Sequence, residues 1–234
     1  FKYVGFKNYV TLLKDPDFLN SLRNAIIFVS GSVSGQVGFG FLAALLLSRI
    51  KLGRNFFRAI YLIPWLLSDS TIGLIFILLF NDQYGVVNEV LSSLGLGKVK
   101  FLTSTDYAIW IVTLVNVWKS ACIVMALCSA GLALMPNELY EVAQIDGASS
   151  DAAFPSALSH NYYYGDSQLL WINIYIVTYG GPLDFTTVPA FYMYRWTLER
   201  GDLGYAFTIV GFILILILNI ILTLTYIKFL LRSR

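Results

Sequence analysis

The chain has 234 residues, of which 57% are hydrophobic and only 13% are charged, and its formal net charge at pH 7 is +2. An ordinary soluble domain has about 25% charged residues, so a water-soluble fold of this size would have too few charges to cover its surface. The composition therefore excludes an ordinary soluble protein. The basic residues are few and scattered, so we expect no nucleic-acid partner.

Residues that could carry a metal or a nucleophile are scarce. Cys122 and Cys128 lie six residues apart in one apolar run, on different faces of a helix, so we expect both to pack against neighbours. His160 is the single histidine and cannot build a metal site by itself. The sequence has no Gly-x-x-x-x-Gly-Lys phosphate-binding motif. We therefore expect no metal, no cofactor bound by this chain and no enzymatic activity.

Long apolar segments dominate the chain. A bilayer core about 30 Å thick requires roughly 20 apolar residues in a helix. Four segments meet this requirement: Ala25–Leu47, Ala59–Phe80, Tyr107–Leu134 and Ala206–Leu231. A fifth, Gln168–Tyr179, covers only about 18 Å at about 1.5 Å per residue and is too short alone. The sequence predicts an all-α, polytopic transmembrane helical bundle over residues 25–234, with about five spans.

The distribution of basic residues bears on the orientation in the membrane. With five spans, seven basic residues fall on one side of the membrane and eight on the other, so their number alone does not decide the orientation. Two clusters adjoin the ends of spans on the same side: Arg49, Lys51, Arg54 and Arg58, and Lys228, Arg232 and Arg234. These clusters favour a cytoplasmic C-terminus and an extracytoplasmic lead-in segment over residues 1–24.

Small residues and one proline are expected to shape the first two spans. Gly31 and Gly35 form a small-xxx-small pair, and Gly38 and Gly40 follow. Such residues let another helix approach closely. Pro64 is expected to bend the second span, which is tolerated where neighbouring groups satisfy the freed carbonyl.

Two charged residues are predicted near the bilayer centre: Asp69 in the second span and Lys119 in the third. An unpaired charge at that depth costs roughly 2.5–3.5 kcal/mol on insertion scales. We hypothesise that the two residues pair or share a water-filled translocation path, the alternative being an interface with a partner chain. Weaker candidates for the path, which could equally join helices by hydrogen bonds, are Gln36, Asn116 and Asn219.

The segment between the third and fourth spans has the pattern of two short helices. Asn137 can cap the first helix, with Glu138 in its first turn, where the helix dipole favours an acid. Asp146 and Gly147 then end that helix. The loop contains four acidic residues and no basic one: Glu138, Glu141, Asp146 and Asp151. It could dock into a basic groove of a partner or simply be a solvated connector.

Residues 141–148, Glu-Val-Ala-Gln-Ile-Asp-Gly-Ala, closely resemble the EAA loop of binding-protein-dependent ABC importer permeases, usually Glu-Ala-Ala-x-x-Asp-Gly-Ala. Further segments that resemble this family are Phe6–Tyr9, Phe57–Trp65, Asn81–Asn88, Val117–Lys119, Tyr179–Pro182 and Gly201–Ala206. The last two resemble the carbohydrate branch, similar to the MalF type.

The resemblance implies the type I permease fold of ABC importers and a multi-pass protein of the bacterial plasma (inner) membrane. It implies a sugar path formed with a second permease subunit, an extracytoplasmic sugar-binding protein, and a cytoplasmic ATP-binding-cassette ATPase dimer that uses the ATP. The cytoplasmic coupling loop near residues 135–155 would dock on the ATPase. The residues carried over for that contact are Glu138, Glu141, Ala143, Asp146, Gly147 and Ala148.

Two features depart from the family pattern. The family usually has another helix before the first span found here, so we expect that first helix to be missing. Residues 152–168 are polar where the family has an apolar segment, through a reading-frame slip, a deletion or genuine divergence. If residues 152–168 are genuine, one alternative is a defective, non-transporting permease copy; the other alternative is an ATP-independent secondary transporter or channel subunit.

Overall fold

The computed structural model describes residues 4–50, 52–133 and 170–232, and within these ranges it consists of helices and loops without a strand. The all-α prediction is thus confirmed. In chain order the helices are α1 (Lys7–Lys14), α2 (Pro16–Arg49), α3 (Arg54–Tyr61), α4 (Ile63–Leu66), α5 (Asp69–Leu79), α6 (Val86–Ser93), α7 (Ala108–Ala133), α10 (Leu170–Val177), α11 (Pro189–Tyr194), η1 (Arg195–Glu199) and α12 (Leu203–Arg232).

Within the described ranges, α2, α7 and α12 are long and apolar enough to cross a membrane. They match the first, third and last predicted spans, although α2 begins at Pro16, well before the expected Ala25. The earlier start has a local cause, because the Asp15 carboxylate accepts a hydrogen bond from the backbone N–H of Asp17 at 3.1 Å and proline suits the first helical position.

The predicted second span, Ala59–Phe80, is interrupted around Pro64, where we expected only a bend. The chain there is broken into α3, α4 and α5. Pro64 lies in the short α4, and Leu67 is extended before the Ser68 hydroxyl caps α5 by accepting the N–H of Thr71 at 3.2 Å. Asp69 therefore lies in the first turn of α5, where the helix dipole favours a carboxylate, and not in the middle of a helix.

Glycines along α2 bring it against α7. An added Cβ at Gly31 would lie 3.0 Å from the nearest atom of α7, and at Gly35 only 2.6 Å from Val117 Cγ2. Gly40 approaches α7 equally closely, whereas a Cβ added at Gly38 would meet no described residue within 4 Å. The predicted close approach thus holds for Gly31, Gly35 and Gly40, and no described helix makes it at Gly38.

Apolar side chains from α2, α5, α7, α10 and α11 form the main core, in which α10 packs against α5 and α7. Gly73 of α5 permits this packing, since an added Cβ would come 2.2 Å from Ile176 Cγ2. The buried core residues are Phe28, Ile72, Phe76, Ile109, Val112, Val115, Ile174, Val177, Val188 and Phe191.

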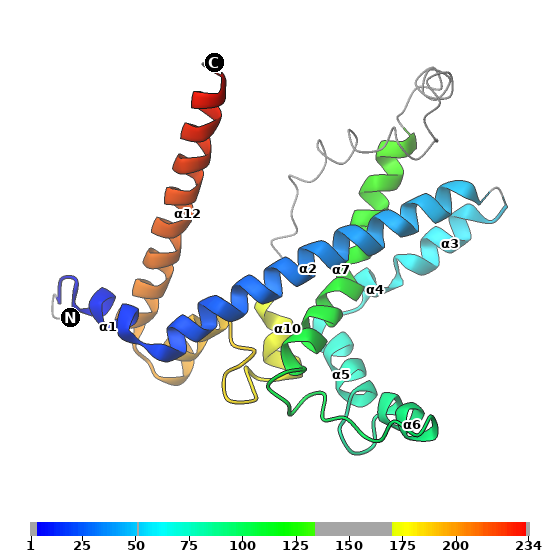
Figure 1. Ribbon diagram of the computed structural model, residues 1–234, viewed down its shortest axis with the longest axis horizontal. Coiled ribbons are helices and arrows are strands. Elements are labelled where there is room, and N and C mark those ends of the chain that lie inside the picture. Colours follow the sequence, from blue (N-terminus) through cyan, green and yellow to red (C-terminus); the bar gives the residue numbers. More distant parts are fainter. Residues whose placement is uncertain (1–3, 51, 134–169, 233–234) are drawn as a thin grey trace.

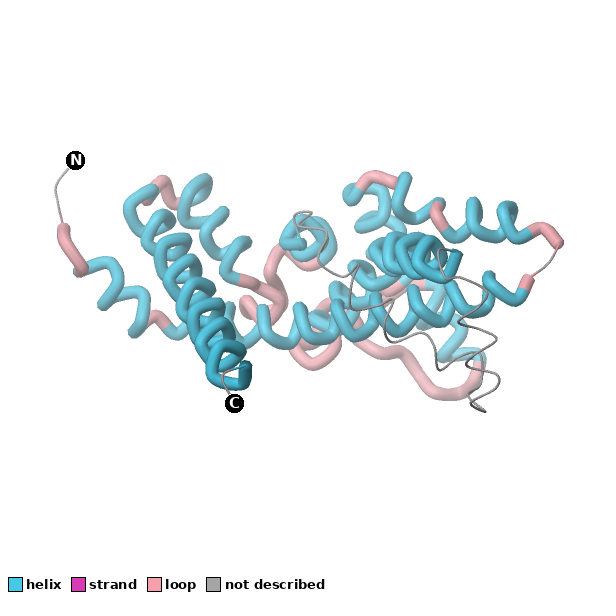
Figure 2. The backbone as a smooth tube through the Cα atoms, turned by 90° about the horizontal axis from the view of Figure 1, so that it is seen from above, coloured by secondary structure: helices cyan, strands magenta, loops and turns pink. Residues whose placement is uncertain are grey.

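Helix α12 stands apart from α2 and α7 along most of its length (Figures 1 and 2). Its first turns pack on α1, the start of α2 and α11 through a second cluster that includes Phe18, Tyr192 and Ile209. Farther along, its apolar side chains are exposed, for example Leu222 at 67%. A helix with such a surface needs lipid or a partner helix around it.

The three long helices begin on one side of the molecule and end on the other (Figure 1). The basic residues Arg49 and Lys228, near the ends of α2 and α12, therefore belong to the same side, as the predicted orientation requires. The ends of α2 and α7 also pack together through Leu47, Met125 and Leu132. The segment that follows α7 consequently starts on this basic side.

Candidate functional site

The structure brings the two predicted intramembrane charges together. Lys119 Nζ of α7 lies 2.5 Å from Asp69 Oδ1 of α5, and their side chains are only 11% and 32% exposed. Such a charge-assisted hydrogen bond neutralises both groups, which would be costly to leave unpaired in a bilayer. The contact joins the first turn of α5 to the middle of α7.

A second polar contact joins α2 to α7 one helical turn before Lys119. Gln36 Nε2 donates a hydrogen bond to the buried Asn116 Oδ1 at 2.6 Å. Asn219 lies elsewhere, on the exposed part of α12, where its amide donates to the carbonyl of Ile215 at 2.8 Å. Two of the three predicted amide residues are thus joined, and the third is bonded within its own helix.

Sequence reasoning missed Asn173 of α10. Its side chain is only 4% exposed, and its Oδ1 atom has no hydrogen-bond partner within the described part of the chain. A buried amide oxygen without a partner costs about 1–3 kcal/mol, so a donor from outside the described residues would be favoured there. An asparagine in an otherwise apolar stretch could have signalled this position.

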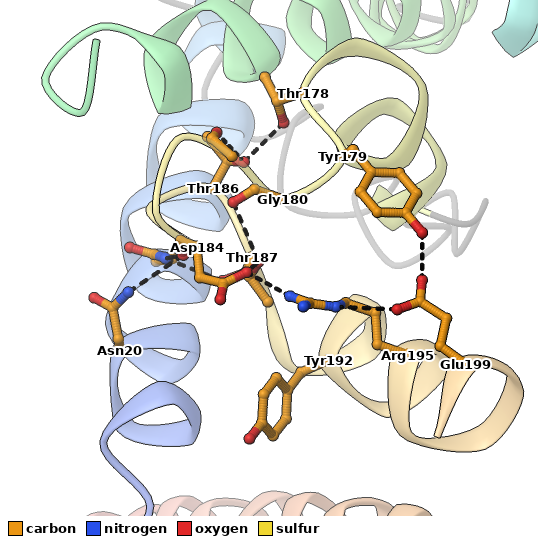
Figure 3. A network of polar contacts seen from close by, with 12 residues as sticks. Asn20, Thr178, Tyr179, Gly180, Asp184, Thr186, Thr187, Tyr192, Arg195 and Glu199 are labelled. Carbon is orange, nitrogen blue, oxygen red and sulfur yellow. Dashed lines mark hydrogen bonds and ion pairs between the residues drawn. The ribbon is translucent and has the colours of Figure 1, made fainter. Parts of the chain in front are cut away.

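On the opposite, predicted extracytoplasmic side, residues 178–188 link α10 to α11 in a tightly held loop (Figure 3). The side-chain amides of Asn20 and Asn24 on α2 donate to the Asp184 carbonyl at 3.2 and 3.0 Å, and Asn24 also donates to the Thr187 carbonyl at 3.0 Å. Arg195 then pairs with the Asp184 carboxylate at 2.5 Å. The loop is thus held at Asp184 by α2 on one side and by Arg195 of η1 on the other.

The Tyr-Gly-Gly-Pro segment belongs to this loop. Gly180 has φ of +80°, and an added Cβ would lie 2.4 Å from Thr187 Oγ1, so only glycine fits. The Tyr179 hydroxyl donates to Glu199, which also pairs with Arg195 (Figure 3). Burial lowers the pKa of Arg195, but the neighbouring carboxylates outweigh it and raise that pKa above its usual value. The segment thus has an architectural role in joining α10, α11 and η1.

The segment Asn81–Asn88 is also architectural. The Asn88 side chain is fully buried and bonds both ways with Val99, donating to its carbonyl and accepting from its N–H at 2.9 Å each. Asp82 accepts the N–H of Leu102 at 3.2 Å. These bonds fold the connection between α5 and α7 around α6.

One polar cluster gave no signal in the sequence. The hydroxyls of Tyr192 and Tyr205 donate to Asp15 Oδ2 at 2.6 and 2.8 Å, across 177 and 190 residues of chain. Burial raises the pKa of Asp15, but these hydrogen bonds outweigh it and hold the pKa below its usual value. The cluster fastens the start of α2 to α11 and α12.

The coupling-loop residues predicted from the resemblance lie outside the described residues, as does His160. Both cysteines are free thiols in α7. Among the residues that the structure does describe, no group of three or more His, Cys, Asp or Glu side chains could hold a metal ion.

No protein-family model matches the chain. The sulfoquinovosyl glycerol transport system permease protein SmoG of Agrobacterium fabrum is 33% identical over 215 residues, covering 87% of this chain and 70% of that protein. The trehalose/maltose transport system permease protein MalF of Thermococcus litoralis is 32% identical over 231 residues, covering 94% of this chain and 78% of that protein.

Among solved structures, a bacterial ABC transporter involved in the import of the acidic polysaccharide alginate shares the fold. Its matching chain has a TM-score of 0.79 at 24% identity, covering 96% of this chain and 83% of that one. Sequence and fold agree along nearly the whole chain. The chain therefore belongs to the permease subunits of sugar ABC transporters, which are integral membrane proteins.

Proposed function

We propose that this chain forms, with a second permease subunit, the membrane path of an ATP-driven importer for a sugar or oligosaccharide. An extracytoplasmic binding protein delivers the sugar, and a cytoplasmic ATPase dimer binds and hydrolyses the ATP. The observation that carries the proposal is the match along nearly the whole chain to permeases such as the trehalose/maltose MalF protein. The alginate importer whose fold it shares has also been crystallised with its periplasmic binding protein, which supports the same division of labour.

Coupling to the ATPase is assigned to the loop near residues 135–155. This loop follows α7, whose end packs against the end of α2 on the basic side of the molecule. Movement of the loop would therefore act directly on the α2–α7 pair. Glu141 and Asp146 would make polar contacts with the ATPase, while Ala143 and Gly147 would allow a close fit.

The sugar path is assigned to the polar groups buried among α2, α5, α7 and α10. The Asp69–Lys119 pair and the Gln36–Asn116 hydrogen bond offer donors and acceptors of the kind that hydroxyl groups of a sugar use. The chain itself holds no cofactor and catalyses no reaction in this scheme, because ATP chemistry is left to the partner subunit.

An ATP-independent transporter or channel would work with ionisable relays in several spans and needs no docking loop. Lys119 and Asp69 instead neutralise each other in one local pair, which favours the importer. A defective copy would not associate with the ATPase. Association with the ATPase therefore distinguishes a working importer subunit from a defective copy.

The test is affinity purification of the tagged chain from its native membranes in mild detergent, with mass spectrometry of the co-purifying chains. We expect an ATP-binding-cassette subunit and a second permease. Glu141→Lys should abolish recovery of the ATPase while the second permease is still recovered. Glu89→Lys, at an exposed position of α6, is the matched charge-reversal control. Unchanged ATPase recovery with Glu141→Lys would overturn the role of the loop, and absence of the ATPase from the wild-type sample would overturn the proposal.

A further inference from the structure

An apolar groove of about 520 Å³ opens between α2, the broken segment α3–α4 and α7. Its volume falls within the roughly 300–1,000 Å³ typical of small-molecule sites. Every lining side chain is apolar or aromatic: Phe39, Ile60, Tyr61, Ile63, Pro64, Leu114, Val117, Trp118 and Ala121. Such a lining in a membrane-spanning region suits a hydrocarbon chain better than a sugar.

Helix α3 separates its polar and apolar side chains. At 100° per residue, Arg54 and Arg58 share a face with Tyr61, which lies one turn beyond Arg58 and lines the groove. Phe56, on another face, is 65% exposed. A short helix of this kind lies at the boundary between headgroups and acyl chains, with its aromatic side chains toward lipid.

The two arginines have no anion within the described part of the chain. The Nε atoms of Arg54 and Arg58 are covered, yet neither meets a hydrogen-bond acceptor, and no ion pair joins either guanidinium to another described residue. Arg54 also begins α3, where the helix dipole disfavours a cation. Arg58 lies in the last turn, where the dipole favours a cation, so helix stability accounts for Arg58 but not for Arg54. An anionic ligand would account for both.

We propose that α3 and the adjoining groove bind one anionic phospholipid, with its phosphate on Arg54 and Arg58 and one acyl chain in the groove past Tyr61. The spacing fits, because Arg54 and Tyr61 are seven residues apart, or about 10 Å along the helix axis. Arginine pairs with phosphate through two parallel hydrogen bonds. In Figure 1, α3 runs back from the end of α2, so the headgroup lies on the basic side of the molecule, in the leaflet predicted to be cytoplasmic.

The test is native mass spectrometry of the delipidated importer complex, titrated separately with palmitoyl-oleoyl phosphatidylglycerol and phosphatidylcholine. We expect tight binding of one phosphatidylglycerol. Because a basic residue near the membrane surface contributes about fivefold, Arg54→Gln/Arg58→Gln should weaken binding by roughly 25-fold. Lys98→Gln/Lys100→Gln removes equal charge from the α6–α7 connection and should leave binding unchanged.

A groove variant tests the acyl chain separately. Leu114 lines the groove and is 42% exposed, so Leu114→Trp should fill the space without disturbing the core and weaken binding although both arginines remain. Equal affinity for the two lipids, or unchanged binding in the arginine variant, would overturn the proposal. Failure of the assembled complex to take up lipid would also overturn it, since another chain would then occupy the groove.

Discussion

Alanine at Gly40 tests whether α2 and α7 depend on direct backbone contact. An added Cβ would lie 2.7 Å from the backbone oxygen of Ala121 and 2.6 Å from Val124 Cβ. Reaching ordinary contact at 3.4 Å from that oxygen requires the helices to part by about 0.7 Å. Overpacking of this kind costs typically about 1–3 kcal/mol. Gly38 is the matched control on the same helix, because a Cβ added there would meet no described residue within 4 Å.

Both substitutions gain the same helix propensity, about 1 kcal/mol from glycine to alanine, so this gain cancels when the two variants are compared. For a chain of this length 1 kcal/mol shifts Tm by about 2–4 °C. Gly40→Ala should therefore unfold roughly 2–12 °C below Gly38→Ala when the purified chain is heated in detergent and followed by tryptophan fluorescence. Equal Tm values for the two variants would refute the close-contact reasoning.

Three further predictions concern polar groups. Asp69→Asn and Lys119→Met should each reduce assembly in the membrane, because the charge left unpaired costs roughly 2.5–3.5 kcal/mol, and the double variant should restore assembly. The yield of assembled complex on a blue-native gel measures this, and a double variant no better than the single variants would disprove the pairing. Asn88→Ala should lower Tm by several degrees, because both Val99 backbone groups lose their partner, whereas Ser93→Ala at the exposed end of α6 should not. The pKa of Asp15 is lowered in the folded state, so Asp15 stabilises the fold above its unfolded pKa near 3.9, and this stabilisation is lost as the pH falls toward the folded pKa. In thermal melts from pH 6 to pH 3, Asp15→Asn should therefore lose less Tm on acidification than the wild type. The same fall in Tm for both proteins would contradict this role.

Composition and periodicity were enough to predict the helical class and three of the long helices, because the membrane requirement for about 20 apolar residues is local. The same reasoning joined α3, α4 and α5 into one span. It expected a bend at Pro64 but missed that Ser68 caps a new helix. The interruption puts Asp69 in the first turn of α5, from which it pairs with Lys119.

The parts that sequence reasoning could not predict depend on contacts between distant residues. Asn24 donates a hydrogen bond to Asp184 across 160 residues, and Tyr205 donates one to Asp15 across 190 residues. No periodic pattern in the sequence predicts either contact. The Tyr-Gly-Gly-Pro segment was found by resemblance, yet its role in fastening α10 to α11 follows only from the geometry around Gly180. The ion pair was accessible from sequence because unpaired charges in a bilayer are costly.

Uptake of radiolabelled sugars into right-side-out membrane vesicles tests the central claim most directly. Vesicles with and without this chain, each supplied with the binding protein, are loaded with ATP or left empty and offered a panel of monosaccharides, disaccharides and acidic oligosaccharides. We predict uptake that requires both the chain and internal ATP and that survives collapse of the proton gradient by an uncoupler. Uptake without ATP that disappears with the gradient would contradict an ATP-driven importer, and a panel in which this chain moves nothing would contradict its role in the sugar path.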